Sequence, residues 1–318
     1  MKVAVLSGGI GCEREVSIQS GDCVVGALKQ AGLNAEIADI RPDNMEVLGA
    51  DDIDVFFIAL HGKFGEDGQL QQILEDKCLV YTGSGPAASR LAFDKLASKK
   101  LFAETGITTP AVIEFDADTD TGQLEKQLPR FADKYVVKPV TQGSTIGVSI
   151  VGDPHKAVAC ARECLSEFGD CMIEEFIGGR EITIGILCGE PLPIIEIRTQ
   201  RGFYDYEAKY IDEQTEYLFD TIEEPALVEH IKSCAMECYN AIGCRHFARV
   251  DSILRDDGAL YVLELNTIPG LTSHSLVPKA AAKAGLSMSD LCVKIIEAAL
   301  EDKNNRGVLV NRTASGQT

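Results

Sequence analysis

Two segments in the C-terminal half of the chain place acidic and amide side chains at alternate positions along otherwise apolar strands. FARVDSIL (247–254) and YVLELNTIPG (261–270) are separated by a short polar stretch that contains Asp257-Gly258. This dipeptide is preferred by two-residue hairpin turns, so the pair predicts an antiparallel hairpin. Side chains in a strand alternate between the two faces of the sheet. The hairpin therefore determines which polar side chains share a face.

A two-residue turn at Asp257-Gly258 pairs residues whose numbers sum to 515. Asp251 then lies opposite Glu264, and Arg249 lies opposite Asn266, with all four side chains on one face. Two carboxylates directly opposite each other repel, and a divalent cation with oxygen ligands, Mg²⁺ or Mn²⁺, would neutralise them. A solvent-exposed polar face explains the same pattern, so the hairpin alone leaves both interpretations open.

The composition excludes several classes of partner. The net charge of −19 over 318 residues repels nucleic acid and anionic lipid. Only four apolar residues follow Met1-Lys2 before Ser7, too few for a signal peptide, and no apolar run approaches membrane-spanning length. The eleven cysteines include no CxxC pair, which favours reduced thiols over disulfides or zinc. We therefore expect a cytoplasmic protein with neither a nucleic-acid nor a membrane partner.

Residues 1–86 alternate between strand and helix patterns. KVAVL (2–6) is an apolar strand, a helix follows from Glu13 to Ala31, and AEIADI and DVFFIAL are further strands. This order predicts a doubly wound α/β domain with a parallel sheet.

Ligand-binding loops of such a domain lie at the carboxyl ends of the strands. SGGIGCERE (7–15) and HGKFGEDG (61–68) occupy that position. The first is not a Rossmann dinucleotide loop, because position 14, where the fingerprint needs glycine, is arginine. An oxidoreductase of that type is therefore a poor interpretation.

The pattern changes after residue 86. Residues 87–175 begin with a helix that carries Lys95 and runs to Gly106, followed by short strands and a helix. Residues 176–302 hold a strand-turn-strand pair, a helix over 225–242, the hairpin and a last helix from about Ser289. Residues 303–318 are predicted to form a flexible tail.

A phosphate-binding loop is suggested by Lys138 and the segment QGSTIG (142–147) that follows it. Backbone N–H groups and hydroxyls in such a loop can hold phosphate, while the lysine supplies a charge. Lys95 offers a second cation. An ordinary hairpin turn and a solvated helix face explain these residues as well.

Two further features suit a nucleoside triphosphate. Glu174 stands just before the apolar pair Phe176-Ile177, which could lie against adenine, and Glu181 could accept hydrogen bonds from ribose hydroxyls. Triphosphates need a metal to bridge their oxygens, and the carboxylates of the hairpin would be ligands for that metal.

Over nearly its whole length, the chain resembles the D-alanine–D-alanine ligases of the ATP-grasp superfamily. Eight blocks carry the resemblance, in order and at compatible spacing. They are LSGGIGCEREVSIQSG, HGKFGEDGQLQ, FDK, VVKP with GSTIGV, EEFIGGREIT, FYDYEAKY, ARVD and LELNTIPGLTSHSLVPKAA. The resemblance implies an α/β fold, α+β in its ATP-grasp part. An N-terminal doubly wound parallel-sheet domain (1–86) would precede a small (87–175) and a large (176–302) ATP-grasp subdomain.

The resemblance also implies which residues bind ATP and metal. Those expected at ATP are Lys95, Lys138, Ser144, Glu174, Ile177, Glu181 and Lys209, with the first two lysines at the phosphates, Glu174 and Ile177 at adenine and Glu181 at the ribose. Those expected to hold two Mg²⁺ or Mn²⁺ ions are Asp251, Glu264 and Asn266.

Two D-alanine molecules are the implied substrates. The residues expected around them are Glu13 at the first ammonium, His61 close to that substrate, Arg249 and the Gly270 backbone at the carbonyl oxygen, and Ser275 and Leu276 at the second carboxylate. Tyr210 and Ser144 would bond to Glu13 and close a lid that includes Tyr204 and Lys209.

The implied reaction activates one D-alanine as an acyl phosphate, joins it to the second, and releases ADP and phosphate for peptidoglycan precursor synthesis. A homodimer is expected from the resemblance alone. One alternative is a D-alanine–D-lactate ligase, although relatives of that type tend to lose the lid tyrosine that is present here as Tyr210. Another is a non-catalytic ATP-binding paralogue, which should lack one or more of Asp251, Glu264 and Arg249.

Overall fold

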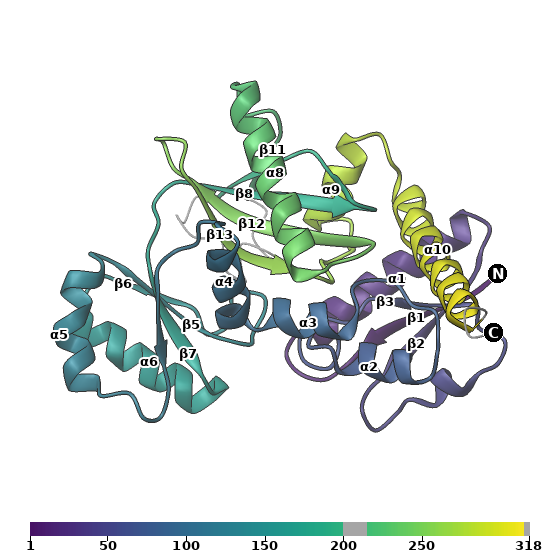
Figure 1. Cartoon of the computed structure of the whole chain (residues 1–318), viewed down its shortest axis with the longest axis horizontal. Coiled ribbons are helices and arrows are strands. Elements are labelled where there is room, and N and C mark those ends of the chain that lie inside the picture. Colours follow the sequence, from purple (N-terminus) through teal and green to yellow (C-terminus); the bar gives the residue numbers. More distant parts are fainter. Residues whose placement is uncertain (200–214, 315–318) are drawn as a thin grey trace.

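The computed structural model describes residues 1–199 and 215–314, with residues 304–314 as backbone only. Three sheets with their helices make up this part of the chain (Figure 1). The predicted lid residues Tyr204, Lys209 and Tyr210 lie outside the described residues.

The first sheet is parallel and has the order β2-β1-β3. Its elements are β1 (Lys2–Gly8), α1 (Arg14–Gln30), β2 (Asn34–Ile40), a 3₁₀ helix (Glu46–Gly49), β3 (Val55–Ile58) and α2 (Gln69–Asp76). This arrangement agrees with the predicted parallel α/β domain. Leu6 pairs with Ile58, so β1 and β3 end side by side and their loops leave the same edge of the sheet.

The second sheet is antiparallel, with the order β4-β7-β5-β6. Its elements are β4 (Val112–Phe115), α5 (Thr121–Phe131), β5 (Tyr135–Pro139), β6 (Ser149–Val151), α6 (Pro154–Phe168) and β7 (Cys171–Glu175). Val136 pairs with Glu174. Lys138, two positions further along β5, therefore points to the same face as Glu174.

The third sheet has the order β11-β10-β8-β12-β13, with β9 paired to β8. Its strands are β8 (Arg180–Leu187), β9 (Glu190–Pro191), β10 (Ile195–Arg198), β11 (Glu216–Leu218), β12 (Phe247–Leu254) and β13 (Leu260–Asn266). The helices α8 (Pro225–Ile242), α9 (Leu276–Lys283) and α10 (Met288–Ala314) belong to the same half of the chain. Ser287 and Asp290 cap α10 reciprocally, since each backbone N–H donates to the other's side-chain oxygen.

The β12–β13 hairpin has the predicted pairing at its functional end but a different turn. Asp251 pairs with Glu264, and Arg249 with Asn266. The turn is not the two-residue Asp257-Gly258 turn. Instead, Arg255 N–H donates to Ala259 O across a three-residue loop (256–258), and Gly258, the last residue of this loop, has a φ of 84°. This shifts the register by one, and a β-bulge after Asp251 shifts it back.

The hydrophobic cores divide the chain differently from the predicted segments. The expected single helix to Gly106 is two helices, α3 (Pro86–Phe93) and α4 (Lys95–Glu104), separated at Asp94, whose side chain caps α4. Both pack in one core with β8, β12 and β13 rather than with the second sheet.

The C-terminal helix α10 returns to the first sheet. Leu291 and Ile295 lie in one core with β1 and β3, and Ser289 Oγ donates to Ala27 O of α1 at 2.8 Å. Helix α10 consequently lies on the same side of the molecule as the N-terminus (Figure 1). The helix continues to Ala314, where the sequence predicted a flexible tail from residue 303.

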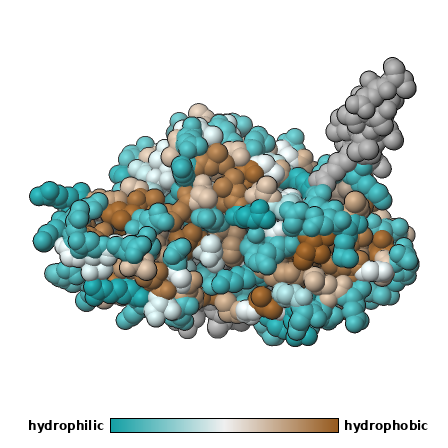
Figure 2. Space-filling view, turned by 60° about the horizontal axis from the view of Figure 1, so that its bottom comes forward, coloured by the Kyte–Doolittle hydropathy of each residue, from teal (hydrophilic) through white to brown (hydrophobic). Residues whose placement is uncertain are grey.

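The surface of one face is a mixture of hydrophilic and apolar areas (Figure 2). Among the described residues, the large apolar side chains that are exposed are Met1, Ile10 and Ile37. All eleven cysteines are free thiols. No helix in residues 1–199 or 215–314 combines the length and apolar character needed to cross a membrane.

Candidate active site

Two adjoining cavities lie between the three sheets. The larger, of about 1040 Å³, is lined by Glu13, His61, Ser144, Arg249, Asn266, Gly270, Ser275 and Leu276. The smaller, of about 350 Å³, is lined by Lys138, Glu174, Ile177, Glu181 and Asp251. Lys95, Gln142, Gly143 and Glu264 line both. Every predicted site residue in the described part of the chain therefore faces one of these cavities.

The shared wall is formed by α4, the loop after β5 and β13. Lys95, the first residue of α4, donates to the carbonyl oxygen of Gln142 at 2.6 Å and lies 3.3 Å from Glu264 Oε2. Its side chain is 11% exposed, so the predicted alternative of a solvated helix face is wrong. A cation held at the junction can act on a ligand that extends through both cavities.

Arg249 and Asp251 form a fork on β12. Arg249 Nε donates to Asp251 Oδ1 at 2.9 Å, and an Nη2 hydrogen bond reaches Oδ2 at 2.7 Å. Thr183 Oγ1 on β8 also donates to Asp251 Oδ1, at 2.6 Å. The fork fixes both the guanidinium and the carboxylate in one orientation on the cavity wall.

The opposed carboxylates Asp251 and Glu264 therefore do not depend on a metal for neutralisation. Arg249 neutralises Asp251, and Lys95 lies beside Glu264. The repulsion between the two carboxylates is relieved by these side chains, so it is not by itself evidence for a metal. The donor set of Asp251, Glu264 and Asn266 still consists of hard oxygens, the ligands that Mg²⁺ and Mn²⁺ prefer. Among the described residues, no group of three or more His, Cys, Asp or Glu side chains could hold a metal.

Glu174 lies between two lysines at the wall of the smaller cavity. Lys138 Nζ is 2.8 Å from one of its carboxylate oxygens, and Lys99 Nζ is 2.7 Å from the other. The side chain of Glu174 is only 2% exposed. Burial would raise the pKa of Glu174, but the two ammonium groups lower it below its usual value. Glu174 is therefore a buried anion that holds Lys138 on the wall of the cavity.

The loop after β5 connects the two cavities to Glu13. Ser144 and Thr145 have φ of 53° and 63°, and the Ser144 hydroxyl donates a short hydrogen bond to Glu13 Oε1. A Cβ on Gly143 would lie 2.9 Å from the same carboxylate oxygen. The loop backbone thus approaches Glu13 closely, and a larger residue at position 143 would displace the carboxylate.

Glu13 stands at the N-terminal end of α1 and is 6% exposed. Burial, and then the negative charge of Glu66, raise the pKa of Glu13 above the usual value for a glutamate. Ser144, His61 and Lys95 act in the opposite direction. A cationic ligand would relieve this unfavourable burial of charge.

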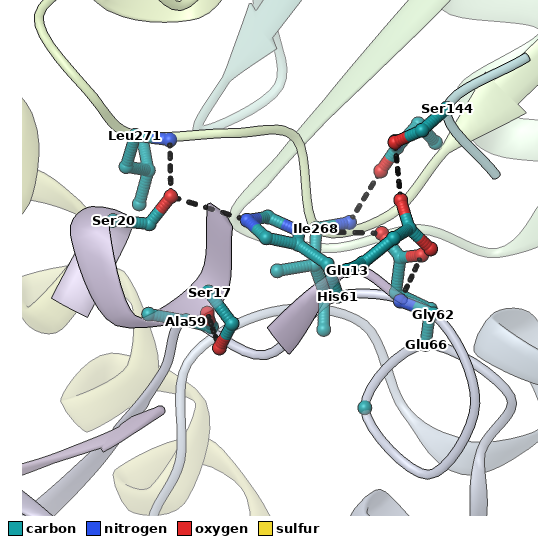
Figure 3. A network of polar contacts seen from close by, with 12 residues as sticks. Glu13, Ser17, Ser20, Ala59, His61, Gly62, Glu66, Ser144, Ile268 and Leu271 are labelled. Atoms are coloured by element: carbon teal, nitrogen blue, oxygen red, sulfur yellow. Dashed lines mark hydrogen bonds and ion pairs between the residues drawn. The ribbon is translucent and has the colours of Figure 1, made fainter. Parts of the chain in front are cut away.

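His61 joins the loop after β3 to α1 and to the loop after β13 (Figure 3). Its Nε2 lies 3.2 Å from Ser20 Oγ, which accepts from Leu271 N–H at 3.4 Å, and its Nδ1 lies 3.8 Å from Glu66 Oε1. Burial alone would lower the pKa of His61, but Glu66 and then Glu13 raise it. Sequence reasoning missed Glu66 and Ser20, although both stand in the blocks that carry the resemblance.

Gly270, Ser275 and Leu276 form the far wall of the larger cavity. Ser275 Oγ accepts from Thr272 N–H at 3.0 Å, and Leu276 is the first residue of α9. A Cβ on Gly270 would lie 2.8 Å from Ser275 Oγ. Gly270 lines the cavity, and a side chain at this position would displace the Ser275 hydroxyl.

Comparison with known proteins gives one consistent result. A family model described as "D-ala D-ala ligase C-terminus" matches residues 101–297. The D-alanine–D-alanine ligase of Syntrophotalea carbinolica is 43% identical over 298 residues, which cover 94% of this chain and 96% of that protein. The enzyme of Stutzerimonas stutzeri is 40% identical over 303 residues, covering 95% and 96%. The structure of the Bacillus anthracis ligase complexed with ATP superimposes with a TM-score of 0.82, at 35% identity, over 96% of this chain and 99% of that one.

Proposed function

Since the chain belongs to the D-alanine–D-alanine ligase family, we propose that it joins two D-alanine molecules into D-alanyl-D-alanine with cleavage of ATP to ADP and phosphate. The product would serve peptidoglycan precursor synthesis. The observation that carries the proposal is the pair of cavities with a common wall of Lys95, Gln142, Gly143 and Glu264. A nucleotide in the smaller cavity and amino acids in the larger would meet at this wall.

In the first step, a carboxylate oxygen of one D-alanine attacks the γ-phosphorus of ATP, and ADP leaves. This reaction depends mostly on positioning and on neutralisation of charge. Lys95 in the shared wall and Lys138 in the smaller cavity would supply positive charge for this step. Glu13 would hold the ammonium of the same D-alanine, and its raised pKa is the electrostatic reason for expecting a cation there.

In the second step, the amine of the other D-alanine attacks the acyl phosphate carbon, and phosphate leaves. Negative charge grows on the carbonyl oxygen, where Arg249 and the Gly270 backbone N–H would stabilise it. The fork with Asp251 supports this role because it fixes the guanidinium before the charge develops. Ser275 and Leu276 would hold the carboxylate of the attacking molecule.

Asp251, Glu264 and Asn266 would hold the divalent metal ions. When bound, such ions would supply positive charge that neutralises the phosphates. Metal binding would require Glu264 to exchange its contact with Lys95, and Asp251 to share its oxygens with Arg249. Tyr204, Lys209 and Tyr210, together with Ser144, would close over the intermediate and exclude water.

The direct test is ADP release measured with D-alanine, L-alanine, D-serine and D-lactate, with the products identified by mass. We expect ADP release that depends on D-alanine and yields D-alanyl-D-alanine. A predominant ester from a mixture of D-alanine and D-lactate at neutral pH would instead support the D-lactate ligase. No D-alanine-dependent release with either Mg²⁺ or Mn²⁺ would support a non-catalytic ATP-binding protein.

The resemblance also leads us to propose a cytoplasmic homodimer. Light scattering on the purified chain measures the oligomeric state. A monomer at micromolar concentration would contradict this part of the proposal without affecting the reaction.

A further inference from the structure

We infer that Lys99, a residue outside both cavities, is a positioning residue for the nucleotide: it holds Glu174 in the orientation that presents Lys138 to the phosphates. The inference rests on the proposed function, because it assigns the smaller cavity to ATP. Lys99 lies on α4, four positions after Lys95, on the same buried face of the helix.

Lys99, Glu174 and Lys138 form a cluster of charged side chains that is almost entirely buried. The side chains of Lys99 and Glu174 are 3% and 2% exposed, and that of Lys138 is 10% exposed. A charged group this deep in a protein is destabilising unless it is paired. Lys99 touches one carboxylate oxygen of Glu174, and Lys138 touches the other, so both oxygens have a cationic partner.

Because each oxygen of Glu174 is paired with a different lysine, Lys138 remains able to bind a further anion. An ammonium group has three donors, and the contact with a single oxygen of Glu174 uses one of them. Lys138 lines the smaller cavity, whereas Lys99 does not. Without Lys99, one oxygen of Glu174 would lose its partner, and the carboxylate would turn toward Lys138 and draw it away from the phosphates.

Lys99 also joins two parts of the fold that form opposite walls of the cavity. The helix α4 packs in the core of the third sheet, and Glu174 stands on β7 of the second sheet. The Lys99–Glu174 ion pair therefore fixes the distance between the lysine-bearing second sheet and the hairpin carboxylates. A contact of this kind can raise nucleotide affinity without touching the nucleotide.

The test is direct binding of ADP by calorimetry, without amino acid, to the full chain and four variants: Lys99→Met, Lys99→Arg, Glu174→Gln and the double variant Lys99→Met with Glu174→Gln. We expect Lys99→Met to weaken ADP binding about tenfold, equivalent to ~1.4 kcal/mol, and to raise KM for ATP more than it lowers kcat. Lys99→Arg should restore most of the affinity, because it keeps the charge. Lys100→Met, which removes an exposed lysine from the same helix, is the matched control.

The double variant distinguishes a positioning role from a general loss of stability. If Lys99 acts through Glu174, its removal in the Glu174→Gln background should change ADP affinity by less than about twofold. Fully additive effects would overturn the inference, as would a Lys99→Met variant that binds ADP like the unchanged chain. If the unchanged chain itself binds no ADP or ATP, the proposed function fails instead. Thermal unfolding of each variant confirms that binding is measured on folded protein.

Discussion

Glu13 is a residue whose surroundings disfavour its charge, as expected for a group that binds a cation. A raised pKa means that the folded chain retains a proton that the unfolded chain has released. The folded state is therefore destabilised as the pH rises from the unfolded value of about 4.5 through the folded pKa. This destabilisation of the folded state is present at neutral pH and absent in acid.

We predict that Glu13→Gln loses activity and gains stability. It should lower kcat/KM for D-alanine about 100-fold, because the ammonium loses a buried anionic partner. It should raise the unfolding midpoint by roughly 1–3 °C at pH 8 and by less at pH 5. Steady-state kinetics and thermal unfolding at both pH values test this. The control is Glu36→Gln, an exposed position on the edge strand β2, which should change neither kcat/KM for D-alanine nor the unfolding midpoint. A lower unfolding midpoint for Glu13→Gln at pH 8 would contradict this prediction.

Glu264 is the residue through which metal dependence can be tested, since it lines both cavities. We predict that Glu264→Gln lowers turnover at least tenfold at low Mg²⁺ and recovers part of it at high Mg²⁺, because an amide is a weaker ligand than a carboxylate. The measurement is a Mg²⁺ titration of the initial rate. Asp256→Asn, exposed in the turn of the same hairpin, is the control. Near-normal activity of Glu264→Gln at low Mg²⁺ would argue against the metal assignment.

At the scale of elements, the β12–β13 hairpin keeps the predicted strand pairing at the cavities although its turn differs from the predicted one. The turn at Gly258 and the bulge after Asp251 each shift the pairing by one, in opposite directions. The pairing of Asp251 with Glu264 results from both. Leu263, the extra residue, lines the smaller cavity beside Glu264.

Gly258 permits a prediction about the turn alone. A Cβ at Gly258 meets nothing within 4 Å, but the φ of 84° is unfavourable for other residues. Gly258→Ala should therefore lower the free energy of unfolding by about 1 kcal/mol and leave KM for ATP unchanged.

The matched comparison is Gly26→Ala, in the exposed middle of α1, where a Cβ also has open space. It should raise the free energy of unfolding by about 0.5–1 kcal/mol, because alanine favours the helix. Denaturant unfolding of both variants gives the comparison. Equal effects of the two substitutions would show that backbone conformation is not the cause.

At the scale of the whole molecule, His246 lies where three parts of the chain meet. Gly83 N–H donates to its Nδ1 at 2.9 Å, and its Nε2 lies 3.1 Å from Asp302 on α10. Since Nδ1 accepts a hydrogen bond, the neutral ring is the form that fits. Burial lowers the pKa of His246 below its usual value, although Asp302 acts in the opposite direction.

The lowered pKa predicts the direction of a pH effect on stability. The stabilising contribution of neutral His246 is present above the unfolded pKa of about 6.5 and is lost as the pH falls toward the folded pKa. His246→Asn, which tolerates the φ of 64° at this position, should flatten the dependence of the unfolding free energy on pH between 7 and 5. Denaturant unfolding at a series of pH values tests this. A variant with an unchanged slope would show that other groups cause it.

Local patterns in the sequence were sufficient for the features that depend on near neighbours in the chain. The periodicities predicted the parallel first domain, and the loops after β1 and β3 carry Glu13 and His61 into the larger cavity. The pairing of Asp251 with Glu264 agrees with the prediction although the predicted two-residue turn does not form, because the bulge after Asp251 offsets the longer turn. The helix and strand periodicities are predictable because backbone geometry over a few residues determines them.

Tertiary structure alone decided which distant groups meet. In the sequence, Lys99 is one of three lysines on α4 with nothing local to distinguish it, yet folding buries it against Glu174. The hydrogen bond from Leu271 to Ser20 joins residues 251 positions apart, and α10 packs in one core with β1 and β3, which lie at the other end of the chain. No local pattern encodes these contacts, since burial and charge pairing depend on the packing of the whole chain.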